Sequence, residues 1–178
     1  SIGDPTIPRT YSVCRKLFDE ALVKQSIETG SEIMLSSKPT SISLNDDRVS
    51  VEISGPNGTE IIHCKLLCGA DGAHSWVRRK LRMGKPTETM IGFQIEVTGY
   101  EGDPGMLDMY TGEKIAPGFF SWAIPSGETT RIGTWTKAEL MNGISSEEYL
   151  DGLISNPELN SRFGNINEVG RFCGPVPS

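Results

Sequence analysis

The stretch Leu66-Leu67-Cys68-Gly69-Ala70-Asp71-Gly72-Ala73-His74-Ser75-Trp76-Val77-Arg78-Arg79 decides how the rest of the chain is interpreted. An apolar run that ends at Leu67 predicts a buried strand, and it leads into a Gly-Ala-Asp-Gly turn. The segment from Ser75 to Met83 predicts a helix, so the pattern is a strand, a tight turn and a helix N-terminus. Glycines in such a turn let a ligand approach the backbone closely.

Two interpretations of this turn follow from the residues alone. In the functional one, Asp71 accepts a hydrogen bond from a sugar hydroxyl, and Arg78 reaches a phosphate or braces the turn. In the structural one, Asp71 and Ser75 only cap the helix that follows. Short glycine motifs do not distinguish between these interpretations.

Composition excludes several classes of protein. A chain of 178 residues can form one sizeable core or two small ones. The formal net charge of −6 argues against a nucleic-acid partner, because phosphate contacts need clustered Lys and Arg. No run approaches the roughly 20 apolar residues of a membrane span, and no signal-peptide pattern is present, so we expect a cytoplasmic protein.

The four cysteines predict buried free thiols, not a metal site or disulfides. On one predicted strand, Cys64 and Cys68 would lie roughly 13 Å apart, too far to share a metal ion. The spread of the four residues over the chain also differs from that of a disulfide-rich miniprotein. We therefore expect no metal and a reducing environment; the cysteines are Cys14, Cys64, Cys68 and Cys173.

The first half of the chain predicts an entry segment, a helix and a β-meander. The helix, Arg15 to Gln25, has an apolar stripe of Phe18, Ala21 and Leu22, and Gly30 can end it. A cation at Arg15 opposes the helix dipole, which suggests a nearby anion. The entry segment is Ser1 to Pro8, and the predicted strands are Thr10 to Val13, Ser31 to Met34, Pro39 to Leu44, Val49 to Ser54 and Glu60 to Cys68.

The pattern changes after a candidate domain boundary at residues 84 to 89. Helical periodicity is absent from Glu88 to Trp135, which predicts an antiparallel sheet. A helix-start signal at Ser145-Ser146-Glu147-Glu148 follows, and the tail from Val169 onward predicts a loop. The four strands expected in the sheet are Met90 to Val97, Met106 to Tyr110, Phe119 to Ile124 and Thr130 to Trp135.

The order Gly-x-Asp-Gly-x-x-Ser-x-x-Arg, from Gly69 to Arg78, resembles the DG motif of FAD-dependent oxidoreductases shaped like p-hydroxybenzoate hydroxylase. The segment from Tyr11 to Leu22 is similar to the one whose arginine approaches FAD in that family. The resemblance implies an α/β (α+β) fold. It divides the chain into residues 1–86 (second half of the FAD-binding domain, with the β-meander), 87–170 (antiparallel-sheet substrate-binding domain) and 171–178 (start of the return to the FAD domain). It also implies FAD as cofactor, bound by Arg15, Gly69, Asp71, Gly72, Ser75 and Arg78.

A second stretch, Ala116 to Pro125, resembles the aromatic-x-Trp-x-Phe-Pro motif that lines the isoprenoid cavity of geranylgeranyl reductases. Periodicity alone favours a core strand here, and Ile124 replaces the second aromatic residue. The resemblance implies substrate contacts at Phe120, Trp122 and Pro125, and saturation of isoprenoid double bonds by hydride from reduced FAD. Peripheral membrane contact is expected from that substrate class.

Several roles stay unassigned on the sequence. His63 and His74 are expected to be structural, and no residue is identified as the proton donor or as another catalytic group. The external reductant, NAD(P)H or ferredoxin, and the oligomeric state are also open.

Two elements of the family are absent from these residues, a Gly-x-Gly-x-x-Gly fingerprint and a Gly-Asp-Ala type segment. We therefore expect the chain to be a central fragment that is inactive alone. Two rival functions remain: an aromatic-ring monooxygenase of the same fold, and a non-catalytic lipid-binding module built on residues 90 to 135.

Overall fold

A computed structural model describes residues 11 and 13–177, which form two compact units. One unit is Val13–Lys85 and the other takes up the chain at Pro86. The first contains, in order, α1 (Arg15–Glu28), β1 (Lys38–Leu44), β2 (Val49–Gly55), β3 (Gly58–Cys64) and α2 (Trp76–Lys80). The second contains β4 (Thr89–Thr98), β5 (Asp108–Thr111), β6 (Phe120–Ser126), β7 (Thr129–Lys137), η1 (Ala138–Leu140), α3 (Ser146–Ile154), η2 (Pro157–Leu159), α4 (Asn160–Phe163) and β8 (Asn167–Pro177).

The β-meander of the first unit forms as predicted, in the antiparallel order β1-β2-β3. Gly58, at φ +113°, makes the tight turn between β2 and β3. Ser31 to Met34, predicted as a strand, has no regular structure, and neither has Tyr11 or Val13. Thr10, Ser12 and the entry segment Ser1 to Pro8 lie outside the described residues.

The strand predicted to run into the DG turn stops early. β3 ends at Cys64, and Leu66 is 76% exposed. The register gives the reason, because Cys64 pairs with Val49, the first residue of β2. Beyond that pair β2 offers no backbone groups to continue the ladder. The prediction of a buried strand up to Cys68 was therefore wrong.

Helix α1 confirms the predicted helix, which ends at Thr29 and Gly30, with Gly30 at φ +96°. Its predicted apolar stripe is not buried: Phe18 is 47% and Leu22 is 48% exposed. The four cysteines are free, as expected. Three of them are exposed and Cys64 is half-buried, so their predicted burial was wrong.

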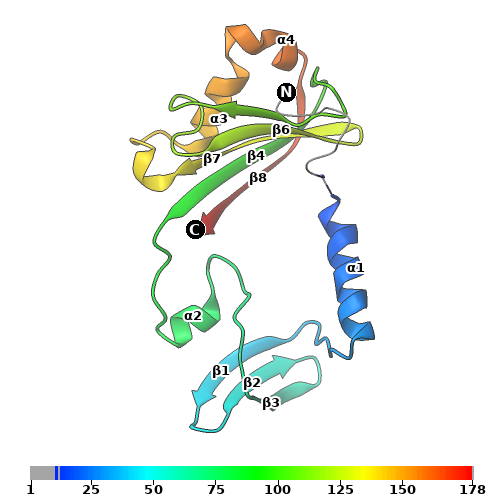
Figure 1. Ribbon diagram of the computed structural model, residues 1–178, viewed down its shortest axis with the longest axis vertical. Coiled ribbons are helices and arrows are strands. Elements are labelled where there is room, and N and C mark those ends of the chain that lie inside the picture. The colour runs from blue at the N-terminus through cyan, green and yellow to red at the C-terminus, as the bar shows by residue number, and fades with distance from the viewer. Residues whose placement is uncertain (1–10, 12, 178) are drawn as a thin grey trace. The chain divides into compact units, whose positions relative to one another are not determined.

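In the described residues, the second unit is built on a five-stranded antiparallel sheet of order β5-β6-β7-β4-β8. The four strands predicted here are confirmed as β4, β5, β6 and β7. Helices α3 and α4 lie over one face of this sheet (Figure 1). The buried core lies between them and the sheet and consists of Phe93, Ile95, Val97, Ala123, Ile132, Leu150, Leu153 and Phe163.

Helix α3 begins at the predicted signal because Ser145 and Glu148 form a reciprocal capping box. The Ser145 hydroxyl accepts a hydrogen bond from the Glu148 N–H at 3.1 Å, and Glu148 accepts one from the Ser145 N–H at 2.7 Å. The helix then buries Tyr149, Leu150 and Leu153. The local sequence signal and the tertiary packing therefore agree for this helix.

The C-terminal tail is a strand, not the predicted loop. β8 pairs antiparallel with β4 from Thr98↔Asn167 to Thr89↔Pro177. Gly170, Gly174 and Pro175 are the residues that indicated a loop, and an edge strand tolerates them because one side of its backbone is unpaired. Residues 171 to 177 thus belong to the sheet.

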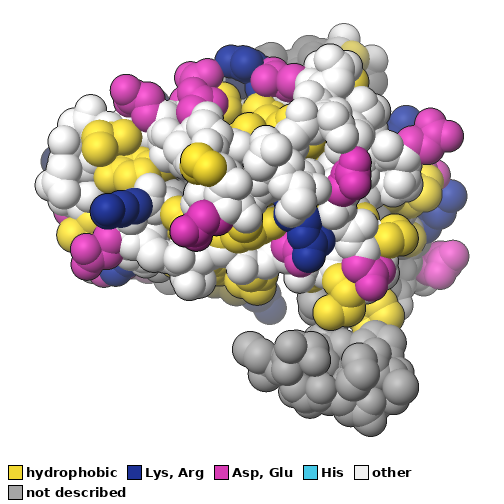
Figure 2. Space-filling view, turned by 90° about the horizontal axis from the view of Figure 1, so that it is seen from above, with side chains coloured by type: hydrophobic (Ala, Val, Ile, Leu, Met, Phe, Trp, Pro, Cys, Tyr) yellow, Lys and Arg dark blue, Asp and Glu magenta, His cyan; other side chains and the backbone are white. Residues whose placement is uncertain are grey.

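The surface of the described residues carries mixed charge. On the face shown in Figure 2, Lys and Arg side chains are dispersed among acidic ones, with no continuous basic patch among the described residues. Within the described ranges, no helix has the length and hydrophobicity needed to cross a bilayer. The same residues hold no group of three or more His, Cys, Asp or Glu placed to bind a metal.

Candidate functional site

In the DG turn, the carboxylate of Asp71 caps helix α2. Its Oδ2 accepts hydrogen bonds from the backbone N–H of Trp76 at 2.6 Å and of Val77 at 3.2 Å. The Ser75 hydroxyl, together with the N–H groups of Val77 and Trp76, lowers the pKa of Asp71 to about 2. The structure therefore shows the capping role of Asp71, and it leaves the carboxylate solvent-exposed and ionised.

The two glycines of the turn have different surroundings. Gly72 has φ +78°, and an added Cβ would meet nothing within 4 Å, so the backbone there is open to an approaching ligand. At Gly69 an added Cβ would lie 2.8 Å from Cβ of Val77. The space left by the missing side chain of Gly69 is therefore filled by α2 packing onto the turn.

Arg78 stabilises the turn by hydrogen bonds to residues of the turn itself. Its Nη2 donates to the Ala73 carbonyl at 2.9 Å, and its backbone N–H donates to Ser75 Oγ at 3.0 Å. The neighbouring Arg79 donates to the carbonyl of His74. Of the two alternatives for Arg78, the structure therefore shows the bracing contact.

Arg15 lies on the exposed first turn of α1 and is paired with Asp19. The Nε–Oδ1 and Nη2–Oδ2 distances are both 3.1 Å. The Asp19 carboxylate raises the pKa of Arg15 by hydrogen bonding. Among the described residues, none of the interactions of Arg15 involves the DG turn, so the structure does not bring it together with Asp71.

The DG turn presents two groups to solvent that a ligand could contact. It combines an exposed, ionised carboxylate at Asp71 with unobstructed backbone at Gly72. A hydroxyl group of FAD could donate a hydrogen bond to the Asp71 carboxylate, and an oxygen atom of FAD could accept one from a backbone N–H of the turn. At Gly72 no side chain obstructs the approach of such a group. Gly69, Ser75 and Arg78 shape the turn that presents these two residues.

A second candidate surface lies on the five-stranded sheet, on the side opposite the buried core. Phe120 and Trp122 alternate onto this side of β6, and Trp135 reaches it from β7. The ring centroids of Trp122 and Trp135 are 5.3 Å apart, and that of Phe120 lies 6.2 Å and 6.1 Å from them. We call this side the aromatic face; the side chains on it include Gln94, Phe120, Trp122, Ile124, Arg131, Trp135 and Phe172.

Two strand glycines seat the indole rings on the sheet. A Cβ on Gly133 would lie 2.7 Å from Cε2 of Trp122, and one on Gly92 would lie 2.5 Å from Nε1 of Trp135. Gln94 Oε1 accepts a hydrogen bond from Trp122 Nε1 at 3.3 Å. The indole rings therefore pack closely against the backbone of the sheet at Gly133 and Gly92, and they line an open depression of about 270 Å³.

Sequence reasoning found part of this face. Phe120 and Trp122 lie on it as predicted, whereas Pro125 pairs with Thr130 and alternates to the side covered by the helices. Trp135, Gln94, Gly92 and Gly133 were missed. An isolated glycine inside a strand often marks a close approach, and that signal was present at both glycines.

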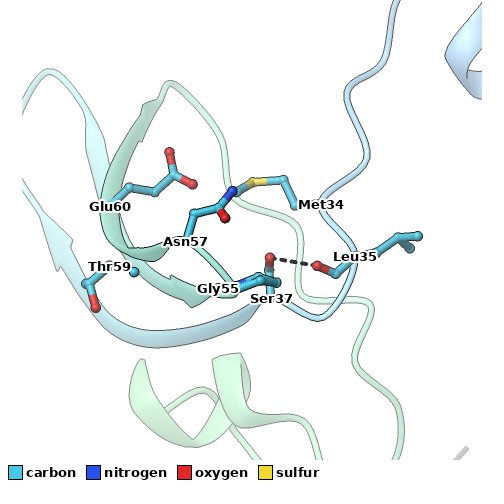
Figure 3. Close-up of a pocket in the computed structure, with 9 residues that line it drawn as sticks. Met34, Leu35, Ser37, Gly55, Asn57, Thr59 and Glu60 are labelled. Carbon is cyan, nitrogen blue, oxygen red and sulfur yellow. Dashed lines mark hydrogen bonds between the residues drawn. The ribbon is translucent and has the colours of Figure 1, made fainter.

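Another depression, of about 480 Å³, lies in the first unit between the loop at Met34 to Ser37 and the β2–β3 turn (Figure 3). The Ser37 hydroxyl donates to the Leu35 carbonyl at 3.1 Å, and Asn57 and Glu60 lie on the opposite side (Figure 3). None of the predicted site residues lines it. It therefore has no connection with the motifs that indicate function.

The DG turn with its helix and the antiparallel sheet that follows it in the chain have the fold of the p-hydroxybenzoate hydroxylase-like flavoproteins. The profile of the FAD binding domain family matches residues 4–144, and the chain belongs to that family. FAD is accordingly the cofactor.

Two solved structures show the same fold. A geranylgeranyl bacteriochlorophyll reductase-like protein from Thermoplasma acidophilum superposes with a TM-score of 0.78 at 21% identity, over 92% of this chain and 42% of its own. The p-nitrophenol 4-monooxygenase of Pseudomonas putida superposes with a TM-score of 0.58 at 19% identity, over 92% of this chain and 42% of its own. Identities this low indicate a shared fold only.

The sequence itself is similar to archaeal reductases. Digeranylgeranylglycerophospholipid reductase 2 of Methanothermobacter thermautotrophicus is 31% identical over 180 residues, which cover 98% of this chain and 46% of the relative. The chain thus spans about half the length of that relative.

Proposed function

We propose that the protein to which this chain belongs is a flavin-dependent reductase that saturates isoprenoid (geranylgeranyl) double bonds in polyprenyl lipid biosynthesis. The aromatic face carries the proposal, because it offers an apolar surface formed by three rings in mutual contact. Similarity to an archaeal reductase of a prenylated phospholipid supports it. Bound FAD, once reduced, supplies the hydride.

The residues of this chain would bind and orient the two partners of that reaction. Asp71 and Gly72 would contact the FAD, with Gly69, Ser75 and Arg78 keeping the turn in shape and Arg15 contributing positive charge. Phe120, Trp122 and Trp135 would hold the isoprenoid chain and exclude water from its double bonds. The side-chain carbonyl oxygen of Gln94, near these rings, is engaged by Trp122, so the surface favours hydrocarbon over a polar ring.

The test uses the full-length protein with its flavin reduced anaerobically. Adding a geranylgeranyl lipid should reoxidise the flavin, and mass spectrometry should show product with hydrogen added at the double bonds. Flavin that stays reduced in the presence of every prenyl lipid offered would contradict the proposal. The chain of residues 1–178 alone is expected to be inactive in the same assay.

An aromatic-ring monooxygenase is the second candidate, because the fold is shared with p-nitrophenol 4-monooxygenase. Oxygen consumption separates the two reactions. A monooxygenase consumes oxygen in proportion to hydroxylated product, whereas the proposed reductase forms product without oxygen. A non-catalytic lipid-binding module would bind isoprenoid lipid and show neither reaction.

Retention of FAD tests the first site separately. In the intact protein, Asp71→Ala should lower the flavin content after gel filtration, since it removes the exposed carboxylate of the DG turn. The matched variant Asp19→Ala, which removes the partner of Arg15, should retain flavin better. Equal flavin content in Asp71→Ala and the unmodified protein would exclude Asp71 from FAD binding.

A further inference from the structure

A half-buried arginine without a partner lies at one end of the aromatic face. Arg131 on β7 pairs with Ile124 on β6 and with Glu96 on β4. Its side chain shares the face with Gly133 and Trp135, because alternate residues of a strand point to the same side. The Nε atom of Arg131 is buried and has no hydrogen-bond partner among the described residues.

An arginine in this state needs an anion. The guanidinium stays protonated at any physiological pH, and a buried N–H group without an acceptor is unfavourable. Glu96 is the acidic residue that lies directly opposite Arg131 in the β4–β7 pairing. Its carboxylate accepts a hydrogen bond from Thr129 Oγ1 at 2.6 Å, and it forms no ion pair with Arg131 within the described part of the chain. The planar fork of an arginine suits a phosphate, which can accept two parallel hydrogen bonds.

The other end of the same face lacks this feature. Lys137 lies on β7 opposite Met90, and its Nζ is 2.9 Å from the Glu88 carboxylate. That cation is neutralised within the chain. From Met90 to Glu96 the face extends roughly 20 Å along β4 at the usual rise per residue. The aromatic face is therefore asymmetric along the strands. Within the described residues, one end carries Arg131 without a partner, the middle carries the aromatic rings, and the other end carries the ion pair of Lys137 with Glu88.

We infer that Arg131 binds the phosphate of a lipid headgroup whose prenyl tail lies over Phe120, Trp122 and Trp135. This inference rests on the proposed function and adds to it a residue that distinguishes phosphate-bearing prenyl lipids from neutral prenyl alcohols. An amphiphile with an anionic head and an apolar tail matches the asymmetry of the face.

The experiment compares a phosphate-bearing geranylgeranyl lipid with geranylgeraniol, each with full-length Arg131→Gln and unmodified protein. Loss of a charge-assisted hydrogen bond should raise KM for the phosphate-bearing lipid about ten- to a hundredfold. KM for the alcohol should change by less than about twofold, because the tail contacts are unchanged. Arg131→Lys should restore part of the discrimination, and Glu96→Gln should strengthen it.

Arg171→Gln is the matched control, since Arg171 lies on neighbouring β8 but pairs with Glu168 and Glu147 on the helix-covered side. This variant should leave the KM ratio of the two lipids unchanged. Inorganic phosphate distinguishes a headgroup site from a free-phosphate site. Competition by phosphate with the lipid but not with the alcohol supports headgroup binding, whereas phosphate binding that is independent of the lipid overturns the inference.

A binding measurement tests the role of Arg131 in lipid recognition without any turnover of substrate. Trp122 and Trp135 report on the aromatic face by fluorescence when Trp76, the third tryptophan of residues 1–178, is replaced by Trp76→Phe in both proteins, so that the difference between them reports on this face. Titration with both lipids should show weaker binding of the phosphate-bearing lipid alone in Arg131→Gln. An equal loss for both lipids, or a lower melting temperature without any change in discrimination, would mean that Arg131 pairs with a group of the protein itself. That result would refute the inference and leave the proposed reductase activity standing.

Discussion

Asp71 shows how one side chain can serve local structure and still be available for a ligand. Its carboxylate holds the first N–H groups of α2, and it stays exposed. The same geometry explains why the sequence alone left its role open. A residue that caps a short helix and a residue that binds a ribose hydroxyl require the same ionised oxygen at the same turn.

The pKa of Asp71 leads to a pH prediction. Because the hydrogen bonds from Ser75, Val77 and Trp76 lower this pKa in the folded state to about 2 from its ordinary value of 3.8, the cap contributes stability above pH 3.8 and loses it as the pH falls through about 2. The amide NMR signals of Trp76 and Val77 should titrate in this window. Asp71→Asn should abolish the titration, and Asp19→Asn should not. A midpoint at the ordinary carboxyl value of 3.8 would contradict the cap.

Ser121 is a buried hydroxyl without a partner among the described residues. It is 0% exposed and faces the core from β6. Since an unsatisfied buried polar group is unfavourable, Ser121→Ala should raise the free energy of unfolding by about 1 kcal/mol or leave it unchanged. Chemical denaturation measures this change.

The matched control is Ser146→Ala, which removes a hydroxyl that is bonded. Ser146 Oγ donates to the Ile91 carbonyl at 3.1 Å and lies 2.7 Å from Thr136 Oγ1. That variant should lose about 1–2 kcal/mol. Equal losses for both serines would show that Ser121 has a hydrogen bond after all.

At the level of elements, the pairing of β6, β7 and β4 builds the aromatic face. The register sets Trp122 beside Gly133, and Gly133 beside Gln94. Strand propensity and alternation predicted each strand separately. Which glycine lies under which ring depends on the register between strands that are far apart in sequence.

Gly133→Ala tests the seating of Trp122. The new Cβ would lie 2.7 Å from Cε2 of Trp122 and 2.9 Å from the Phe93 carbonyl oxygen, so the ring has to move away from the sheet. We expect a loss of about 1–3 kcal/mol of stability from this overpacking. The hydrogen bond to Gln94 should weaken, with a change in Trp122 fluorescence. Gly152→Ala, where a Cβ meets nothing within 4 Å, is the control. A spectrum unchanged by Gly133→Ala would mean that Trp122 does not lie on Gly133.

At the scale of the whole molecule, hydrophobic burial is unequal between the two units. Among the described residues, Val51 and Val77 are the buried apolar side chains of Val13–Lys85, whereas the other members of the buried set lie after Pro86. Helix α1 has no buried residue at all. Burial of apolar area is the main favourable term in folding, so the second unit is the more stable of the two.

Hydrogen exchange of residues 1–178 should therefore be slow in β4, β6 and β7 and fast in α1. Residues Pro86–Ser178, produced alone, should still unfold cooperatively, because the core given by Phe93, Ile132 and Leu150 lies wholly within them. Residues Val13–Lys85 produced alone should show no such transition. Protection of α1 equal to that of β4 would contradict this view.

The sequence by itself determined the local elements and the motifs. Alternation indicated β1, β2, β4, β6 and β7, the pattern at Ser145 indicated α3, and the order from Gly69 to Arg78 indicated the nucleotide-type turn. Each of these signals is carried by residues close together in the chain, where propensity, capping and turn chemistry act directly.

Only the tertiary structure decided the remaining features. β8 forms because β4 offers it a free edge, despite Gly170, Gly174 and Pro175, and the predicted strand at Leu66 fails because β2 offers none. The same holds for the face on which Pro125 lies and for the unpaired state of Arg131. Each of these depends on which distant strand supplies the partner, and that pairing is a property of the assembled sheet.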